Sequence, residues 1–244
     1  MRIAVVTGAS SGLGKEFVRQ ISERYRTLDE IWVLARRAER LKELANEINN
    51  VNIRCISCDI TDKRKLLKYR NALKKYNPSI RILVNAAGYG IIGHFDELKE
   101  EDNVGMVELN SAALTRITDI SLPYMARGGA NIINIASSAA FLPQPSFAVY
   151  AASKAYVLSL SRALNKELKK RKIAVTAVCP GPVETEFFDI AETYNSVKLY
   201  KKLFRAKPED VVKLALKDAY HKRSVSLYGG TMKGFRILCK LLPQ

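Results

Sequence analysis

The stretch RIAVVTGASSGLG, residues 2–14, decides the fold. Its first part, RIAVVT (2–7), is β-branched and mostly apolar, and it leads into a turn with glycine at positions 8, 12 and 14, where a helical pattern begins. Such a strand–turn–helix unit lets the backbone approach a pyrophosphate, whose charge the helix N-terminus favours. The spacing is GxxxGxG and not the common GxGxxG, so the stretch predicts a variant of the dinucleotide-binding turn.

Outward from this turn, short β-branched runs alternate with longer helical patterns. The expected strands are RIAVVT (2–7), EIWVLA (30–35), NIRCIS (52–57), IRILVN (80–85), NIINIA (131–136), IAVTAV (173–178) and SVSLY (224–228). The expected helices span about 12–25, 38–49, 62–76, 99–126, 150–171 and 208–221. Nearly continuous apolar strands suit a parallel sheet covered on both faces. We therefore expect one α/β domain over residues 1–244, a doubly wound (Rossmann) domain with a parallel sheet of about seven strands flanked by helices.

Bulk composition excludes several other classes of protein. Of the 244 residues, 48% are hydrophobic and 26% are charged, which is typical of a globular chain and unlike a disordered or fibrous one. No stretch of the sequence approaches the roughly 18 uncharged apolar residues of a membrane span, and the first residues, MRIAVVTG, lack signal-peptide architecture. We expect a cytoplasmic protein without an integral membrane segment, whose cysteines are reduced.

The net charge of +16, from 40 Lys plus Arg against 24 Asp plus Glu, is the unusual bulk property. Such a field attracts nucleic acid, anionic lipid or a phosphorylated ligand without choosing among them. Many cations lie in helical segments such as 62–76 and 162–172, between apolar residues at helical spacing, which is typical of a solvated helix face. The sequence has no zinc-finger spacing and no RNP-like strand, so we expect no nucleic-acid partner; charge-driven nucleic-acid binding remains an alternative.

A metal site is not expected either. Cys55 and Cys58 form a CxxC, but residues three apart in a strand point to opposite faces. The two histidines, His94 and His221, are far apart in sequence. The thiols fit a buried core better than a metal or redox site.

The end of the second strand predicts which dinucleotide is bound. An NAD site would place Asp or Glu on the ribose 2′-hydroxyl about 20 residues after the turn. This chain has Ala35-Arg36-Arg37 there instead, and an arginine fork binds a 2′-phosphate. We therefore predict NADP(H), with Arg36 as the main contact because it directly follows the strand. The alternative is a solvated pair of cations at the start of a helix.

Further motifs follow along the chain. They are Asn85-Ala86-Ala87-Gly88, Asn110, Ser137, Tyr150-Ala151-Ala152-Ser153-Lys154 and Pro180-Gly181-Pro182-Val183. Together with the glycine turn, and in this order, they resemble the short-chain dehydrogenase/reductases, in particular their NADP(H)-type bacterial reductases, from residue 1 to about 229. Ala86 departs from the family pattern, which often has a second asparagine there. The family's usual offset from the tyrosine selects Ser137 over Ser138 as the catalytic serine.

Tyr150 and Lys154 are four residues apart in a helical segment, so their side chains share one face at about 5 to 6 Å between Cβ atoms. An ammonium about 5 Å from the phenol contributes roughly 3 kcal/mol at an effective dielectric of 20. Bringing a tyrosine pKa from about 10 to near 7 takes about 4 kcal/mol, and the oxidised nicotinamide cation can add to the lysine contribution, so the magnitudes are compatible. A tyrosine and a lysine at this spacing are common in helices. The accompanying motifs are what favour a catalytic role for this pair.

The resemblance implies interconversion of a carbonyl compound and an alcohol by direct hydride transfer, with no metal. Tyr150 would then be the proton donor or acceptor and Ser137 a hydrogen-bond donor to the substrate oxygen. Lys154 would hold the nicotinamide ribose, and Asn110 would position a water. The residues implied to bind the cofactor are Gly8, Ser10, Ser11, Gly12, Leu13, Gly14, Arg36, Arg37, Asp59, Ile60, Asn85, Ala86, Gly88, Tyr150, Lys154, Pro180, Gly181, Val183 and Thr185. Asp59 has an alternative role as a helix cap.

Two late segments bear on the substrate. Residues 186–207 fit no strand and are expected to form a mobile flap, whose apolar residues are Phe187, Phe188, Ile190, Tyr194, Val197, Leu199, Tyr200, Leu203 and Phe204. They suit either a lipophilic pocket, for a steroid, bile acid or fatty acyl chain, or ordinary helix packing. Residues 233–242 place Phe235, Leu238, Leu241 and Leu242 on one helical face, which would dock on the body or a partner subunit, or else lie on an anionic membrane.

The expected partners are a small carbonyl or alcohol substrate and, by resemblance, further copies of the chain. Helices at 99–126 and 150–171 would pair in a homodimer or homotetramer, although their sequence equally describes a monomer. The alternative function is a non-catalytic cofactor-binding sensor or scaffold of the same fold. The intact set of catalytic motif residues argues against it, because a sensor needs no tyrosine hydroxyl.

Overall fold

The computed structural model describes residues 1–193 and 205–241, over which seven parallel strands form one sheet in the order β3-β2-β1-β4-β5-β6-β7. The strands are β1 (Arg2–Thr7), β2 (Glu30–Ala35), β3 (Asn52–Ser57), β4 (Ser79–Asn85), β5 (Ala130–Ile135), β6 (Ile173–Val178) and β7 (Val225–Ser226). The direction of winding switches between β1 and β4, which pair with each other. The predicted doubly wound α/β fold is confirmed.

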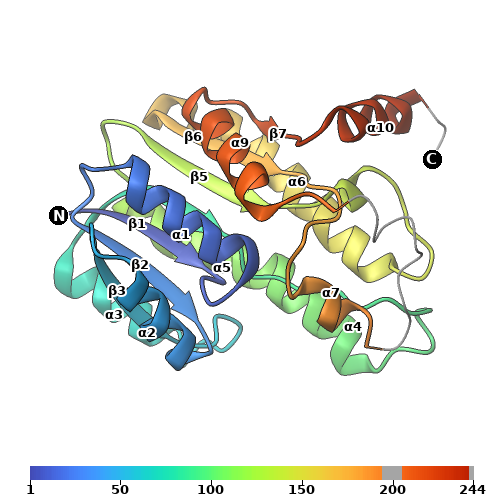
Figure 1. Ribbon diagram of the computed structural model, residues 1–244, viewed down its shortest axis with the longest axis horizontal. Coiled ribbons are helices and arrows are strands. Elements are labelled where there is room, and N and C mark those ends of the chain that lie inside the picture. Colours follow the sequence, from blue (N-terminus) through green and yellow to red (C-terminus); the bar gives the residue numbers. More distant parts are fainter. Residues whose placement is uncertain (194–204, 242–244) are drawn as a thin grey trace.

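Helices cover both faces of the sheet (Figure 1). One face carries α1 (Gly12–Arg24), α2 (Ala38–Glu47) and α9 (Pro208–Tyr220). The other carries α3 (Leu67–Tyr76), α5 (Leu114–Ser121) and α6 (Ala148–Glu167). In β1, Ala4 and Val6 join the first core and Ile3 and Val5 the second. Because strand side chains alternate between faces, a strand that is apolar at every position is buried on both sides.

Several boundaries differ from the predicted ones. The helix predicted over 62–76 begins at Leu67, because the Asp62 carboxylate accepts the backbone N–H groups of Arg64 and Lys65 in a turn. The helix predicted over 99–126 consists of α4 (Glu100–Val107), the π-helix η1 (Glu108–Ala113), α5 and the 3-10 helix η2 (Leu122–Tyr124). The helix predicted over 150–171 ends in the 3-10 turn η4 (Leu168–Arg171). Changes of helix type of this kind mark positions where packing overrides the regular pattern.

The carboxyl ends of the strands share one edge of the sheet, beyond which α4, α7 (Phe187–Ala191) and α10 (Gly230–Leu241) lie (Figure 1). The first helix of the predicted flap is α7. Residues 194–204 of the flap lie outside the described residues, and they include six of its apolar residues: Tyr194, Val197, Leu199, Tyr200, Leu203 and Phe204. Doubly wound sheets bind ligands at this edge, near the switch in winding direction. Among the described helices, none has the length and hydropathy needed to cross a bilayer.

Candidate active site

A cavity of about 1200 Å³ opens at the carboxyl edge of the sheet. The glycine turn and the residues after β2 and β3 line one part of it; α7, α10 and the segment after β5 line another. Most of the predicted site residues line it, namely Gly8, Ser10, Ser11, Gly12, Leu13, Gly14, Arg36, Arg37, Asp59, Ile60, Ala86, Gly88, Ser137, Tyr150, Lys154, Pro180, Gly181, Val183 and Thr185. Motifs far apart in the sequence therefore meet in one hollow.

The glycine turn leaves no room for side chains. Gly8 has a φ of +67°, and a Cβ there would lie 2.7 Å from backbone atoms of Ala87. A Cβ at Gly14 would collide with the carbonyl oxygen of Gly8. Only glycine fits both positions, so bare backbone and the start of α1 face the cavity. This cradle fits the pyrophosphate of a dinucleotide, because a helix N-terminus presents unpaired N–H groups to an anion.

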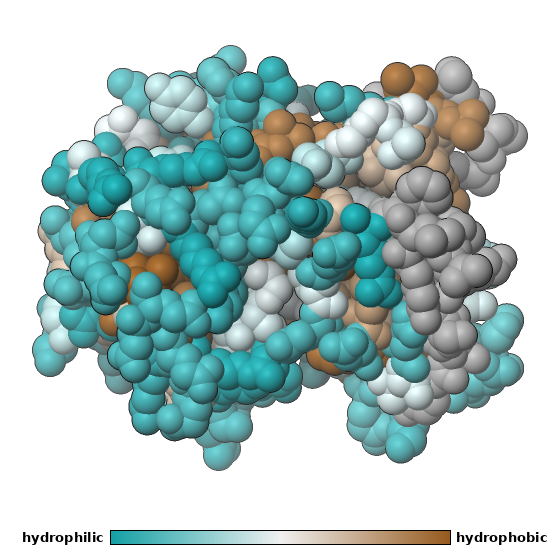
Figure 2. Space-filling model, viewed as in Figure 1, coloured by the Kyte–Doolittle hydropathy of each residue, from teal (hydrophilic) through white to brown (hydrophobic). Residues whose placement is uncertain are grey.

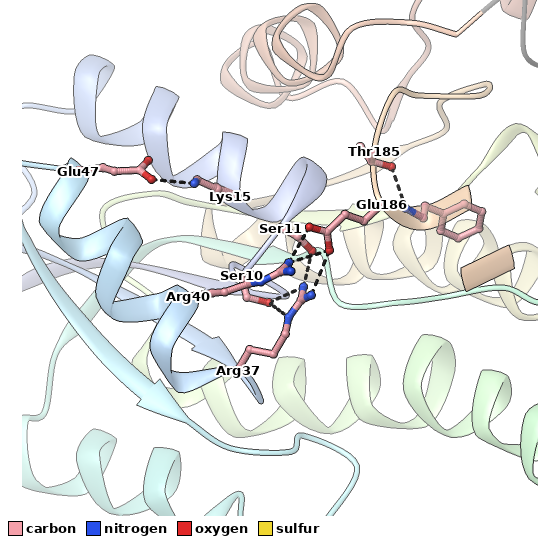
Figure 3. A network of polar contacts seen from close by, with 9 residues as sticks. Ser10, Ser11, Lys15, Arg37, Arg40, Glu47, Thr185 and Glu186 are labelled. Carbon is pink, nitrogen blue, oxygen red and sulfur yellow. Dashed lines mark hydrogen bonds and ion pairs between the residues drawn. The ribbon is translucent and has the colours of Figure 1, made fainter. Parts of the chain in front are cut away.

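Arg37 reaches the glycine turn, as Figure 3 shows. Its Nη2 atom donates to Ser11 Oγ at 2.7 Å and to Ser10 Oγ at 3.1 Å. Arg36 also lines the cavity, but its charge acts on Asp59, at the end of β3. Within the chain, the Arg37 guanidinium makes the contacts with the turn, and the role of Arg36 as the main contact with a 2′-phosphate stays a prediction.

Asp59 does not cap a helix, because α3 begins only at Leu67. Its Oδ1 atom accepts the backbone N–H of Thr61 at 3.0 Å and the Thr61 hydroxyl at 2.7 Å. Partial burial acts to raise the pKa of Asp59, but the bonds from Thr61 and the charge of Arg36 outweigh it, and the pKa lies below its usual value. Asp59 is thus an ionised hydrogen-bond acceptor on the cavity wall.

Tyr150 and Lys154 lie one turn apart in α6, and both are buried. The Lys154 ammonium donates to the carbonyl of Ile135 at 2.8 Å. Burial lowers the pKa of Lys154 to about 8. Burial also raises the pKa of Tyr150 to about 12, although a hydrogen bond with Ser137 acts to lower it.

Burial decides the pKa of Tyr150 within the chain. The lowering of that pKa expected from the sequence rests on Lys154 together with the oxidised nicotinamide cation, and that combination stays a prediction; within the chain by itself the cost of burying a phenolate dominates. Tyr150 is therefore a neutral phenol at neutral pH, which suits a group that gives up a proton.

Ser137, rather than Ser138, stands beside the Tyr150 phenol. The Ser137 hydroxyl oxygen accepts the N–H of Ala139 at 3.1 Å, at the start of the 3-10 turn η3 (Ser138–Phe141). The Ser137 side chain also acts to lower the pKa of Tyr150. Ser138 uses its backbone N–H to bond the carbonyl of Pro180 at 2.9 Å, which ties the segment after β5 to the segment after β6.

Asn110 lies behind the cavity wall, fully buried in the π-helix. Its Nδ2 atom donates to the Tyr89 carbonyl at 2.8 Å and to Ser153 Oγ at 3.0 Å, and its Oδ1 atom accepts the Tyr89 N–H at 3.0 Å. A Cβ at Gly88 would lie 2.8 Å from that Oδ1 atom. Both amide hydrogens of Asn110 are thus engaged inside the protein. The side chain clamps the backbone after β4 and is not among the residues that line the cavity in the described part of the chain, and its role in positioning a water stays a prediction.

Asn85 is not brought to the cavity. Its amide nitrogen donates to Asn134 Oδ1 at 2.8 Å and to Thr118 Oγ1 at 3.0 Å, both in the interior. These bonds tie β4 to β5 and α5. The role in cofactor binding that the resemblance implies for Asn85 stays a prediction, whereas Ala86 and Gly88, just beyond the strand, do line the cavity.

Sequence reasoning missed the packing around the Tyr150 ring. Phe147 stacks on it with ring centroids 4.2 Å apart, and Phe187 of α7 packs at 5.5 Å. A Cβ at Gly90 would lie 2.6 Å from Tyr150 Cδ2. The spacing of Phe147, three residues before Tyr150, is a signal that could have found it. The sequence placed Phe187 only among the apolar flap residues.

The helix α10 forms another part of the cavity wall. Met232 and Phe235 line the cavity, and the Phe235 ring centroid lies 6.4 Å from that of Phe141 in η3. Phe235 therefore packs against the body of the protein, which is one of the two alternatives given for residues 233–242. Leu238, predicted on the same face, is 53% exposed, and Figure 2 shows apolar side chains over the outer end of α10. Leu242 lies outside the described residues.

Fold and cavity together define an α/β protein of the Rossmann class, with a cavity at the carboxyl edge of its sheet that a glycine turn lines. The family model described as short chain dehydrogenase matches residues 2–194. An uncharacterised oxidoreductase of Staphylococcus epidermidis is 31% identical over 185 residues, 75% of this chain and 79% of that protein. A Listeria innocua protein named NAD-dependent glycerol dehydrogenase is 33% identical over 220 residues, 88% of this chain and 85% of that protein.

Two solved structures resemble the whole chain. A short-chain dehydrogenase from Sphingobium yanoikuyae in complex with NADPH is 28% identical, with a TM-score of 0.83, over 100% of this chain and 97% of the other. The bulky-bulky ketone specific alcohol dehydrogenase from Comamonas testosteroni is 27% identical, with a TM-score of 0.78, over 100% and 96%. The chain belongs to the short-chain dehydrogenase/reductase family and is an oxidoreductase.

Proposed function

We propose that the protein is an NADPH-dependent oxidoreductase that interconverts an apolar carbonyl compound and its alcohol. One observation carries the proposal: the buried, protonated Tyr150 phenol lines the same cavity as the glycine turn and Arg37. A phenol with a pKa of about 12 holds its proton at neutral pH. It therefore suits reduction, in which a carbonyl oxygen must take up a proton.

The residues at the glycine turn support a dinucleotide with a 2′-phosphate. Arg36 and Arg37 supply cations beside the turn, and Ala35 leaves no carboxylate at the end of β2. The Sphingobium neighbour is described with NADPH and the Listeria relative as NAD-dependent, so the choice of NADP(H) rests on the arginines. When bound, the reduced nicotinamide supplies a hydride for the carbonyl carbon. Val183 and Thr185 are proposed to hold its carboxamide.

Three side chains of α6 and the segment after β5 handle the proton. Ser137 donates its hydroxyl hydrogen to the substrate oxygen, and Tyr150 transfers its proton to the same oxygen. The Lys154 ammonium, 5.6 Å from the Tyr150 ring centroid, stabilises the phenolate that remains and holds the nicotinamide ribose. These groups neutralise charge where it develops on the substrate oxygen.

An apolar wall supports an apolar substrate. The side chains around the reacting end of the cavity include Ile91, Leu142, Phe147, Phe187, Phe188 and Phe235. Apolar walls with a few placed polar groups are typical of sites for lipophilic ligands. We propose a bulky ketone or alcohol of the steroid, bile acid or fatty acyl type.

We also propose that the chain works in the cytoplasm as a homodimer or homotetramer. Val104 and Val107 of α4 and Tyr156 of α6 are 46%, 47% and 43% exposed, which leaves apolar surface on the helices expected to pair. Light scattering on the purified protein tests the assembly, because a multiple of 27.3 kDa is expected.

Cofactor consumption with a graded panel of ketones and aldehydes tests the proposed activity. NADPH and NADH are each offered with small polar, small apolar and bulky apolar carbonyl compounds. We expect the fastest consumption with NADPH and a bulky apolar member. Tight cofactor binding without turnover of any panel member would favour the sensor or scaffold alternative.

A further inference from the structure

Glu186, which directly precedes α7, is ion-paired with Arg37, which lines the cavity, and with Arg40 of α2 (Figure 3). Its carboxylate lies 3.0 Å from Arg37 Nη1, and its two oxygens lie 2.6 and 2.8 Å from Arg40 Nη1. Partial burial acts to raise the pKa of Glu186, but the bonds from Arg37 and Arg40 outweigh it and hold the pKa below its usual value. Glu186 is therefore an anion at neutral pH.

The Arg37 guanidinium is shared between this carboxylate and the glycine turn. Its Nε atom donates to Ser10 Oγ at 3.2 Å, and its Nη2 atom donates to Ser10 and Ser11. Its Nη1 atom bonds Glu186. A guanidinium has five N–H donors in a fixed fork. A second anion at Arg37 must therefore share the guanidinium with the Glu186 carboxylate or replace that carboxylate. Arg37, Ser10, Ser11 and Glu186 all line the same cavity.

We propose that Glu186 determines cofactor specificity by competing with the 2′-phosphate of NADP(H) for Arg37 and Arg40. The inference rests on the proposed function for the nature of the ligand, a phosphate on the adenosine ribose. A carboxylate and a phosphate on one arginine pair repel each other, so the phosphate displaces Glu186. The negative charge of Glu186 thus weakens NADPH binding without a matching effect on NADH.

Displacement of Glu186 also reaches the Tyr150 end of the cavity. The neighbouring residue Phe187 packs on the Tyr150 ring at 5.5 Å, and its backbone N–H donates to Thr185 Oγ1 at 3.4 Å. Thr185 in turn lies against the glycine turn, since a Cβ at Gly12 would be 3.3 Å from it. Residues 185–187 therefore connect the arginine pair, the turn and the phenol. Loss of the ion pair is expected to loosen α7 next to Tyr150.

The substitution Glu186→Gln tests the competition, because it removes the charge and keeps the shape. Binding of adenosine 2′,5′-bisphosphate and of 5′-AMP is measured by calorimetry; neither probe has a nicotinamide, so turnover plays no part. We expect the bisphosphate to bind about 3- to 10-fold more tightly to the variant, and 5′-AMP to change by less than about twofold. An unchanged or weaker affinity for the bisphosphate would overturn the proposal, because Glu186 would then merely orient Arg37.

Glu47→Gln is the matched control. Glu47 also bonds two cations, Lys15 at 2.8 Å and Arg19 at 2.6 Å, and its side chain is 39% exposed against 45% for Glu186. It does not line the cavity in the described part of the chain. If Glu47→Gln raised the bisphosphate affinity equally, the change in net charge alone would explain the gain in Glu186→Gln. That result would overturn the role of Glu186.

Two further comparisons complete the design. In the unmodified protein, equal affinity for the two probes would count against the proposed NADP(H) preference, while a selective gain in Glu186→Gln would still support the competition. Hydrogen–deuterium exchange over residues 185–191 follows the loosening of α7. We expect faster exchange with the bisphosphate than with 5′-AMP in the unmodified protein, and no difference in the variant. Equal exchange in the unmodified protein would overturn the displacement.

Discussion

The ammonium group of Lys154 lies 5.6 Å from the centroid of the Tyr150 ring, one helical turn along α6. Burial acts on the two groups in opposite directions, raising the pKa of Tyr150 to about 12 and lowering that of Lys154 to about 8. Each shift favours the uncharged form, because the cavity wall solvates charge poorly. At neutral pH the pair is a neutral phenol beside an ammonium, which is the protonation state needed to give up a proton.

Tyr150→Phe should abolish turnover while cofactor binding and folding persist. The change removes one hydroxyl and keeps the ring that packs against Phe147 and Phe187. We expect kcat to fall at least about 100-fold, the low end of general-acid contributions. Tyr156→Phe is the matched control on the same helix, because the Tyr156 hydroxyl bonds only Thr115 among the described residues. If the Tyr150→Phe variant kept more than about a tenth of the original rate, the assignment of Tyr150 as proton donor would be wrong.

Lys154→Met should stabilise the fold below pH 8 and abolish activity. The pKa of Lys154 is about 8 in the folded chain against 10.5 for a free lysine, so between these values only the unfolded chain binds the proton. This group therefore makes stability rise with pH across that window, and below it the buried charge costs stability. Allowing for the lost bond to the Ile135 carbonyl, we expect a net gain of about 1 kcal/mol, or roughly 2–4 °C in Tm, at pH 7.

Thermal unfolding of the two proteins between pH 6 and pH 10.5 checks the sign of this effect. The difference in Tm should be largest below pH 8 and should shrink toward pH 10.5. A lower Tm for Lys154→Met at pH 7 would show that the bond to Ile135 outweighs the cost of the buried charge.

Arg37→Ala should weaken the use of NADPH more than Arg36→Ala. A hydrogen bond to a charged group contributes about 1.5 to 3 kcal/mol, so kcat/KM for NADPH should fall roughly 10- to 150-fold, with little change for NADH. Adding Ala35→Asp should turn the preference toward NADH by repelling the 2′-phosphate. Arg64→Ala is the control, since Arg64 does not line the cavity in the described part of the chain. Equal kcat/KM values for the two cofactors in the unmodified protein would contradict the assignment.

Phe235→Ala should raise KM for bulky apolar substrates, because it removes part of the cavity wall that α10 supplies. We expect a loss of about 2 kcal/mol of binding, or roughly 30-fold, with kcat for small carbonyl compounds preserved. Leu238→Ala, on the same helix and 53% exposed, is the matched control and should leave KM unchanged. Deletion of residues 233–244 should likewise alter substrate affinity or assembly more than liposome binding; the reverse result would indicate a membrane role for α10.

The sequence by itself determined the doubly wound sheet, the glycine turn and most of the predicted residues that line the cavity. These features are readable because each depends on local physics. Apolar runs indicate strands that are buried on both faces, and glycines indicate a turn without room for a Cβ. Spacing within one helix places Tyr150 and Lys154 on the same face. The same local rules could have placed Phe147 against Tyr150.

Only the tertiary structure decided what those side chains meet. The π-helix turns Asn110 onto the backbone of Tyr89, the interior bonds of Asn85 draw it away from the cavity, and burial sets the pKa of Tyr150. Glu186 and Arg37 are 149 residues apart and meet because β2 and β6 end at the same edge of the sheet. Such contacts depend on how elements pack and on the dielectric they create, and neither quantity is a property of a local stretch of sequence.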